Sequence, residues 1–321
     1  MNKIVDGFTF FNELDLLEIR LKYLYDVVDY FVIVEADKSF NGEIKHMFFK
    51  ENIQRFSPFM DKIIYVPINM KCFEDEKKIA WKREEYQRNS IINGIVSLNL
   101  KETDYVLISD VDEIPDIEIL KKIKFKNEQF NEVSKVSNIK IFFKVIFNIF
   151  KAILYKIISK DISKLRSQLK LIYLTKARNY MPPLNFKMFN YYYYLNYQKS
   201  GSKWSGIQCV QFKLLNKFTA NELRNFRNSP LCTLNDSGWH FSYLGGKEMI
   251  KHKIKNFSHQ EFNIPQILSD EYIDFCVKNG YSLFDYYKNP KTKPKYVKKK
   301  ISHLPEKLQR IVNVYENLIL D

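Results

Sequence analysis

The sequence is poor in residues that mark several common protein classes. Its 321 residues include only 9 Gly and 4 Cys. Cys72, Cys209, Cys232 and Cys276 are far apart and form no C-x-x-C pair, so neither a disulfide framework nor a zinc site is expected. Buried free thiols in a reducing compartment are the simpler expectation. The first eleven residues lack a long apolar core, which predicts no signal peptide.

Apolar and aromatic residues are abundant. The apolar fraction is 45%, with 26 Phe and 21 Tyr, which is enough for one large domain or two small ones. The net charge of +14 is uneven, because acidic residues concentrate in the first third and basic ones at 135–178 and 288–300. Such a chain attracts phosphates, nucleic acid or anionic membranes. The asymmetry suggests an acidic metal site with basic flanks.

Residues 1–116 alternate between strand and helix patterns. Leucines at 14, 17, 21 and 24 recur at helical spacing, after Asn12 as expected N-cap with Asp15 as its capping-box partner. Strands are expected at 3–5 and 8–11, joined by a turn at Asp6-Gly7, and at 30–34, 62–66 and 105–108, with a helix at 75–93. This order predicts a mostly parallel sheet with helices on its faces.

The later sequence differs in character. Aromatic-rich strands are expected at 186–197 and 207–215, as an antiparallel extension of the sheet, with a helix at 247–257. After Lys288 we expect a loosely packed, Lys-rich arm before a last helix at 305–320. Within 127–178, Lys140, Lys144 and Lys151 form a cationic stripe on an apolar helix. That helix suits either an anionic lipid surface or packing against the core or another subunit.

The most informative segment is 104–116, Asp-Tyr-Val-Leu-Ile-Ser-Asp-Val-Asp-Glu-Ile-Pro-Asp. A short apolar run typical of a buried strand is followed at once by Asp110, Asp112 and Glu113. Roughly one chance Asp-x-Asp is expected in a chain of this size, but the preceding strand makes this one more specific. Open α/β sheets bind ligands at the carboxyl ends of their strands. Clustered carboxylates there suit a divalent cation, and the cation suits a phosphate.

Six segments, in order, resemble glycosyltransferase family 17. They are residues 10–20, 31–36, 81–88, 108–115, 238–243 and 253–259, and the resemblance covers roughly 3–125 and 180–265. Several ordered segments are far more specific than any one. Against the animal members of the family we expect two departures, the absence of an amino-terminal membrane anchor and stem and the presence of the basic insert, and both leave the acceptor open.

The resemblance implies a GT-A-type nucleotide-sugar-binding fold, with a mixed, mostly parallel sheet flanked by helices. It also implies transfer of a sugar, usually N-acetylglucosamine, from a UDP donor to a glycan acceptor with inversion. We expect a nucleotide-sugar-binding half at 1–126, a basic helical insert at 127–178, an acceptor-side half at 179–287 and the Lys-rich arm and helix at 288–321. The expected location is cytoplasmic, with the insert at the inner membrane face.

The expected metal ligands for Mn²⁺ or Mg²⁺ are Asp112, Asp110 and His240. A cation bridging the diphosphate acts as a Lewis acid on the leaving group, and a neutral imidazole suits Mn²⁺. Asp112 is the first choice. Asp110 could instead contact the donor ribose or a metal-bound water, and Glu113 could orient either carboxylate or serve as a turn carboxylate.

Further residues are candidates for binding the donor or for proton transfer. A guanidinium group can donate two parallel hydrogen bonds to phosphate oxygens, so Arg20, Arg83 and Arg88 are expected to bind the donor. Lys253 and Glu35 are further expected donor-binding residues. An inverting transfer also needs a general base. Asp236 is the expected base, with Glu35 and Glu261 as alternatives, and a loop or helix-cap carboxylate is the other interpretation for each of them.

Two other classes of function fit part of the sequence. A phosphatase of the haloacid-dehalogenase type also places Asp-x-Asp after an apolar strand, but a Thr or Val is normal where this chain has Ile114. A non-enzymatic basic protein that binds membranes or nucleic acid fits the net charge and the insert. Carboxylates at a buried strand would repel polyanions, so nucleic acid is not an expected partner.

Overall fold

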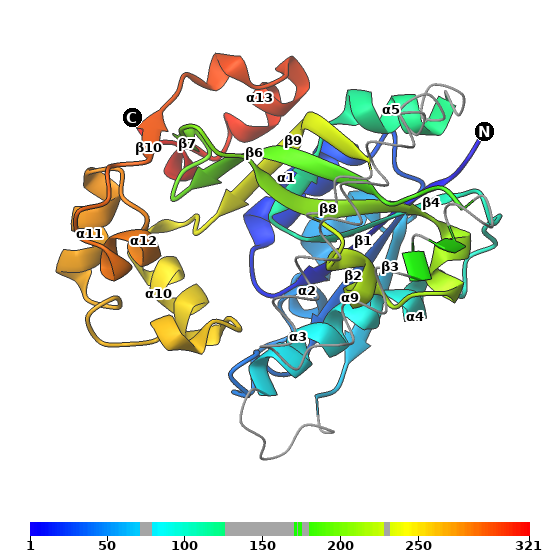
Figure 1. Cartoon of the computed structure of the whole chain (residues 1–321), viewed down its shortest axis with the longest axis horizontal. Helices are drawn as coiled ribbons and strands as arrows, with labels where there is room; N and C mark the ends of the chain where they lie inside the picture. The colour runs from blue at the N-terminus through cyan, green and yellow to red at the C-terminus, as the bar shows by residue number, and fades with distance from the viewer. Residues whose placement is uncertain (71–78, 126–169, 172, 175–179, 228–231) are drawn as a thin grey trace.

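The structure is a computed structural model that describes residues 1–70, 79–125, 170–171, 173–174, 180–227 and 232–321. Within these residues a mixed sheet of ten strands forms the centre of the molecule (Figure 1). Its main path runs in the order β10-β7-β6-β8-β4-β1-β2-β3, and β9 joins β6 to β5. The bounds are β1 Ile4–Phe10, β2 Tyr30–Ala36, β3 Ile63–Ile68, β4 Tyr105–Asp110, β5 Glu113–Pro115, β6 Leu184–Tyr192, β7 Tyr197–Lys199, β8 Trp204–Gln211, β9 Thr233–Ser242 and β10 Tyr296–Lys298.

The two halves of the sheet differ in strand direction. Strands β1 to β4 are parallel to one another, as the alternating pattern of the first third predicted. Strand β8 then pairs antiparallel with β4, and β6 antiparallel with β8. The sheet is therefore continuous from the amino-terminal strands into the strands that follow residue 184.

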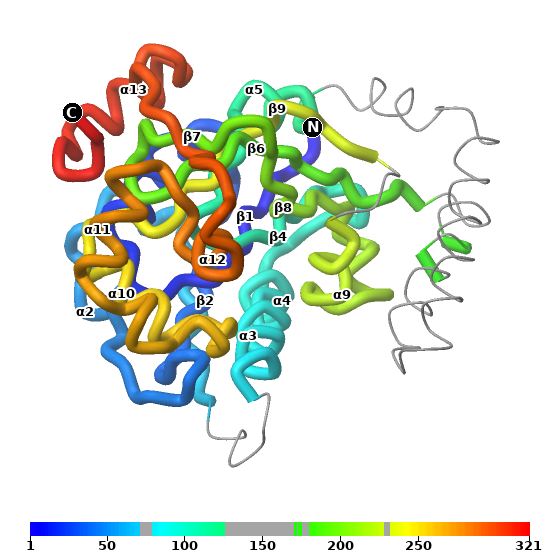
Figure 2. The backbone as a smooth tube through the Cα atoms, turned by 60° about the vertical axis from the view of Figure 1, so that its left-hand side comes forward, coloured from blue at the N-terminus to red at the C-terminus, as the bar shows by residue number. Residues whose placement is uncertain are grey.

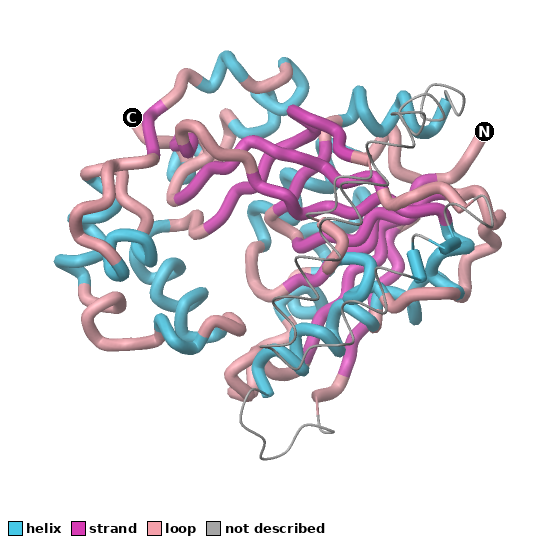
Figure 3. Tube along the Cα trace, in the orientation of Figure 1, coloured by secondary structure: helices cyan, strands magenta, loops and turns pink. Residues whose placement is uncertain are grey.

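Helices cover both faces of the sheet (Figure 3). Helices α1 and α13 pack on each other beside one face, and α3, α4 and α9 contact strands on the other. The bounds are α1 Leu14–Leu24, α2 Phe48–Glu51, α3 Ile79–Asn89, α4 Ile91–Ile95, α5 Ile117–Phe125, α9 Ala220–Arg224, α10 Gly246–Asn256, α11 Asp270–Lys278, α12 Leu283–Lys288 and α13 Glu306–Val312.

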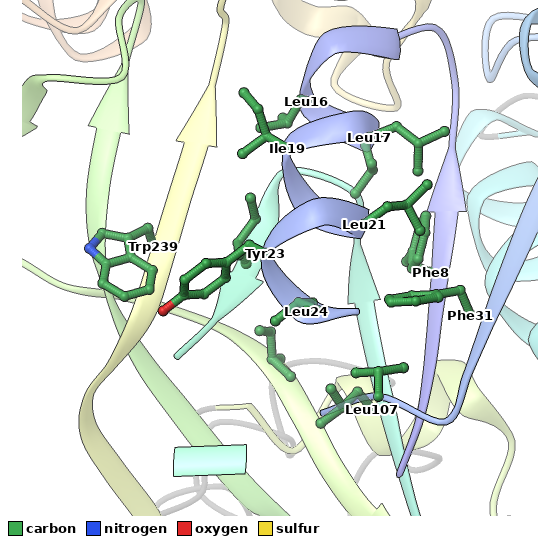
Figure 4. Packing of buried hydrophobic residues seen from close by; sticks show 14 of the residues in the cluster. Phe8, Leu16, Leu17, Ile19, Leu21, Tyr23, Leu24, Phe31, Leu107 and Trp239 are labelled. Carbon is green, nitrogen blue, oxygen red and sulfur yellow. The ribbon is translucent and has the colours of Figure 1, made fainter. Parts of the chain in front are cut away.

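Side-chain alternation along the central strands feeds two hydrophobic cores. Phe8, Phe31 and Leu107 belong to the core under α1. Val5, Val32 and Val106 of the same strands belong to the other core. Figure 4 shows leucines of α1 beside these sheet residues, and Tyr23 meets Trp239 of β9 edge to face with ring centroids 5.9 Å apart. The central strands are thus buried on both faces, which explains their continuous apolar runs.

A third core lies at one side of the sheet. Helices α10, α11 and α12 lie together there (Figures 1 and 2). Their buried residues pack with tyrosines of the strand edges, including Tyr193 and Tyr296. This group of helices forms one wall beside the carboxyl ends of the central strands.

Two local predictions for the first strand and helix are wrong. Strand β1 runs without a turn through Asp6 and Gly7, because the buried Asp6 carboxylate is paired with Arg20 and a side chain at Gly7 would lie 2.5 Å from Ile91. The N-cap of α1 is Glu13 rather than Asn12, and it makes no side-chain cap bond. The expected capping box is therefore absent.

Most residues between 289 and 300, the expected arm, are exposed, and the last helix expected at 305–320 is shorter, since α13 ends at Val312. Strand β10 pairs with β7, and Leu304, Leu308 and Val312 are buried in the same core as α1. The basic insert at 127–178 lies outside the described residues, apart from 170–171 and 173–174. None of the helices that the structure describes is both long enough and apolar enough to cross a membrane.

Candidate active site

A cavity of about 380 Å³ opens at the carboxyl ends of β1, β2 and β4. This volume falls within the range of small-molecule sites. Asp110 and Asp112 lie on its lining, together with His240 and Lys253 from β9 and α10. Sequence reasoning placed the acid pair at this edge of the sheet, and the fold brings it together with the distant His240.

Backbone pairing holds His240 beside Asp112. Strand β5 pairs antiparallel with β9 so that Glu113 lies opposite His240. The Phe241 N–H also donates to the Asp112 carbonyl at 2.8 Å. As a result, His240 Nε2 lies 3.6 Å from Asp112 Oδ2.

The His240 ring is fixed on two sides. Its Nδ1 lies 3.0 Å from Asn190 Oδ1, and its ring stacks on Trp204 with centroids 4.4 Å apart and an interplanar angle of 11°. With Nδ1–H donating to the Asn190 oxygen, the Nε2 lone pair is directed to the Asp112 side. A second hydrogen bond of this kind is the usual way in which a metal-binding histidine is oriented.

Lys253 supplies a positive charge to the same carboxylate. Its ammonium donates to Asp112 Oδ2 at 2.8 Å and to the Ser242 hydroxyl at 3.2 Å, and it lies 3.6 Å from Glu13. Burial alone would raise the pKa of Asp112, but Lys253, together with His240 when its imidazole is protonated, outweighs burial and holds that pKa well below its usual range. Asp112 is therefore an ionised carboxylate at neutral pH.

Asp110 is held by two guanidinium groups. Arg88 and Arg224 donate to its two oxygens at 3.1 and 2.9 Å, and Thr9 donates to one of them at 3.0 Å. Burial would raise the pKa of Asp110, but Arg224 and Arg88 outweigh it and hold that pKa well below its usual range. Arg88 lines the cavity as expected of a donor-binding residue, yet it also binds Glu84 at 2.8 Å.

Glu113 lies beneath the cavity and not on its lining. Its side chain is fully buried and accepts from Arg224 at 2.6 and 2.7 Å and from the Trp204 indole at 2.6 Å. A side chain at Gly206 would lie 2.0 Å from its Oε1. These contacts fix Arg224 and Trp204, which supports the expected orienting role of Glu113. They also leave no room for substrate at its carboxylate.

Arg20 does not reach the cavity, contrary to the expectation that it binds the donor. It is fully buried and forms a two-bond pair with Asp6 at 2.6 and 2.8 Å. It also donates to the carbonyls of Asp110, Val111 and Glu113 at 2.6–3.1 Å. Arg20 thus holds the turn that carries the acid pair, and its donors have no capacity left for a phosphate.

Arg83 and Glu35 are likewise absent from the lining, which contradicts their expected contact with the donor. Arg83 donates to the Phe40 carbonyl at 3.1 Å and packs against Gly42. Glu35 is fully buried, where it accepts from the Phe49 N–H at 3.2 Å and from the Tyr65 hydroxyl at 2.9 Å. Both residues fix loops that follow the central strands.

Asp236, the expected general base, lies away from the cavity. Its side chain is 54% exposed and paired with Lys203, and it does not belong to the lining. It sits in an irregular part of β9 with φ of 52°. The strand turns its later residues, not Asp236, to the site.

Sequence reasoning missed several charged residues at the site, among them Glu13, Arg224 and Arg227. Glu13 and Arg227 line the cavity, and Arg224 binds both Asp110 and Glu113 from below. Glu13 lies within one of the matched segments and could have been considered. Arg224 and Arg227 belong to no motif, and only the fold brings them to the acid pair.

The Asp112 and His240 side chains fit a divalent cation in part. No group of three or more acidic, His or Cys side chains among the described residues could hold a metal by itself. However, neighbouring ligands of an octahedral Mg²⁺ are about 3 Å apart, and such ions complete their shell with water and substrate phosphates. The 3.6 Å separation of Asp112 and His240 suits such a pair, whereas both Asp110 oxygens are already held by arginines.

Comparison with known proteins agrees with the motifs. The model of glycosyltransferase family 17 matches residues 1–141. The beta-1,4-mannosyl-glycoprotein 4-beta-N-acetylglucosaminyltransferases of Rattus norvegicus, Homo sapiens and Mus musculus are each 30% identical over 117 residues, which is 35% of this chain and 22% of each relative. The chain therefore spans about a fifth of the length of the curated relatives it matches. These matches confirm that the chain resembles glycosyltransferase family 17 over its amino-terminal 141 residues.

Proposed function

We propose that this protein is a GT-A-type glycosyltransferase that moves N-acetylglucosamine from UDP to a hydroxyl of a glycan, with inversion and with help from a divalent cation. The observation that carries the proposal is the convergence of Asp112, His240 and Lys253 in one cavity at the carboxyl ends of the parallel strands. Ligands of open α/β sheets bind at this edge. The family match and the names of the relatives support the sugar class.

In the proposed complex, Asp112 and His240 hold Mn²⁺ or Mg²⁺. A bound divalent cation would neutralise charge on the departing diphosphate as a Lewis acid. Lys253, which contacts Asp112 in the present structure, supplies a second positive charge to the leaving group. Arg88 and Arg224 keep Asp110 ionised and fixed, so that it can accept a hydrogen bond from the donor ribose or a metal-bound water.

Glu13 replaces Asp236 as the proposed general base. It lines the cavity at the start of α1, and one of its oxygens contacts its neighbour's backbone N–H at 3.1 Å. Its other oxygen lies 3.6 Å from Lys253, the nearest cation among the described residues. In this role Glu13 takes the proton of the acceptor hydroxyl as the new bond forms.

The phosphatase alternative fits this geometry poorly. It requires Asp110 as a nucleophile, with an oxygen free to attack phosphorus. Both oxygens of Asp110 instead accept from arginine guanidinium groups. A nucleophile held in this way would have to break those contacts first.

The test is a screen of UDP- and GDP-sugars for turnover, by release of the nucleoside diphosphate, with Mn²⁺, with Mg²⁺ and with EDTA. We expect UDP-N-acetylglucosamine to be used, and EDTA to abolish turnover. Asp112→Asn should lower kcat by a factor on the order of 10³, since a metal contact contributes several kcal/mol in the transition state. Absence of turnover with every nucleotide sugar, or full activity of the variant, would refute the proposal.

Asp236→Asn is the matched control, because the same change is made outside the cavity. It should leave kcat and KM unchanged. Glu13→Gln should lower kcat by about 10²–10⁴ while UDP binding persists, as for loss of a general base. If Asp236→Asn lost activity and Glu13→Gln did not, the earlier assignment of the base would be restored.

A further inference from the structure

Arg227 differs from the other arginines around the acid pair. It lines the cavity just after α9, with its guanidinium carbon 5.7 Å from the centroid of the Trp204 ring. Among the described residues, no carboxylate forms an ion pair with it. Its backbone N–H donates to the Arg224 carbonyl at 3.2 Å, which leaves the guanidinium out of that bond. Arg227 therefore presents a guanidinium to the cavity with its donors available.

The neighbouring cations are already neutralised. Arg224 binds Asp110 and Glu113, Arg88 binds Asp110 and Glu84, and Lys253 binds Asp112. Lys38 also lines the cavity, on the loop after β2, but its ammonium is a point charge and not a planar fork. The arginines that sequence reasoning assigned to phosphate are thus engaged, and Arg227 is not.

The charge of Arg227 is unfavourable in its partly buried position. Burial lowers its pKa, and the nearby positive charge of Arg224 lowers it further. A partly desolvated cation without a partner is costly. A bound anion would remove that cost, because a guanidinium binds phosphate oxygens through two parallel hydrogen bonds.

Two ring contacts connect Arg227 to the proposed metal ligands. Trp204 contacts Arg227 and stacks on His240, and its indole N–H is fixed by Glu113 at 2.6 Å. With a divalent cation on the Asp112–His240 pair, a ligand that spans from that cation to Arg227 would need negative charge at both ends. A nucleoside diphosphate has this character, with two linked phosphates.

We propose that Arg227 binds the diphosphate of the nucleotide donor, a role that rests on the proposed function and assigns its main phosphate contact to a residue outside every matched motif. The contact would stabilise the bound donor and also the nucleoside diphosphate that leaves after transfer. Arg227→Gln removes both the positive charge and the planar guanidinium that can donate two parallel hydrogen bonds. Arg227→Lys keeps only the charge.

The experiment measures binding of UDP and of uridine by calorimetry at a fixed Mn²⁺ concentration, and binding of inorganic pyrophosphate to the same variants. Arg227→Gln should weaken UDP binding at least tenfold and leave uridine binding unchanged, with Arg227→Lys in between. Lys38→Gln should have a smaller effect on UDP. Arg310→Gln, which alters an exposed arginine of α13, should behave as wild type.

Thermal unfolding separates a binding role from a structural one. Arg227 makes no ion pair within the described residues, so Arg227→Gln should unfold at the same temperature as wild type or slightly above it. Wild-type UDP affinity in Arg227→Gln would overturn the inference while leaving the proposed function standing. If wild type binds pyrophosphate but no UDP, and Arg227→Gln loses the pyrophosphate, the anion site is supported and the proposed donor is refuted.

Discussion

At the scale of single residues, the sequence indicated which chemical groups form the site better than it indicated which side chains contact one another. Asp110, Asp112 and His240 were grouped from motifs, and the structure places all three on one cavity. The roles of the arginines could not be assigned in this way, because the sequence does not distinguish a buried arginine that binds backbone carbonyls from one that binds phosphate. For this reason Arg20 was assigned to the donor although it is buried, and Arg227 was given no role.

Arg20→Met tests the structural role of Arg20. The change leaves Asp6 buried without a partner and releases three carbonyls of the acid turn. Loss of one partner of a buried ion pair costs about 3–5 kcal/mol of unfolding free energy, which urea titration followed by circular dichroism would measure. Arg55→Met is the control, since Arg55 pairs with Asp15 and Glu18 at the surface, and it should cost less than about 1 kcal/mol. A stable Arg20→Met variant with only a higher KM would indicate a ligand contact instead.

At the scale of elements, the central strands and α1 were predictable, because their apolar patterns are continuous or helical. Strands β5 and β9 were not, because their register depends on each other and on β6. The pairing of β6 with β9 shifts between Lys187 and Phe189, which takes up extra residues near Asp236 and Gly238. A single sequence shows no pattern that marks such an irregularity in advance, although it decides which side chains of β9 reach the cavity.

Gly238→Ala should disturb the junction of β5 and β9. Gly238 has φ of 153°, and an added Cβ would lie 2.3 Å from the Ile114 carbonyl oxygen. We expect a loss of about 1–3 kcal/mol in unfolding free energy and faster hydrogen exchange at the Phe241 amide, which donates to Asp112. Gly201→Ala is the control, because Gly201 also has a positive φ but nothing lies within 4 Å of its Cβ position. Unchanged exchange at Phe241 in Gly238→Ala would show that this junction does not depend on the glycine.

At the scale of the whole molecule, the last helix was predictable from the sequence, but its packing against α1 was not. The composition after Lys288 is rich in Lys and Pro, which resembles a loose arm when local composition is the only guide. The expected helix beyond this stretch is present, and its Leu308 and Val312, with Leu304 just before it, are buried in the core that contains α1. A few apolar residues spaced for one helix face outweigh the surrounding charges, since burial of each contributes about 1.5–3 kcal/mol.

Leu308→Ala therefore tests whether the carboxyl terminus is part of the folding unit. Leu308 is fully buried on α13, and removing its side chain should lower the unfolding free energy by about 2–5 kcal/mol. The urea transition should stay single, with the same UDP affinity in the folded protein, because α13 packs on α1 and not on the cavity. Val314→Ala, at a site that is 70% exposed, should change stability by less than about 0.5 kcal/mol. A separate early transition in Leu308→Ala, with the main transition unmoved, would mean that residues after 300 unfold on their own and that the sheet does not depend on them.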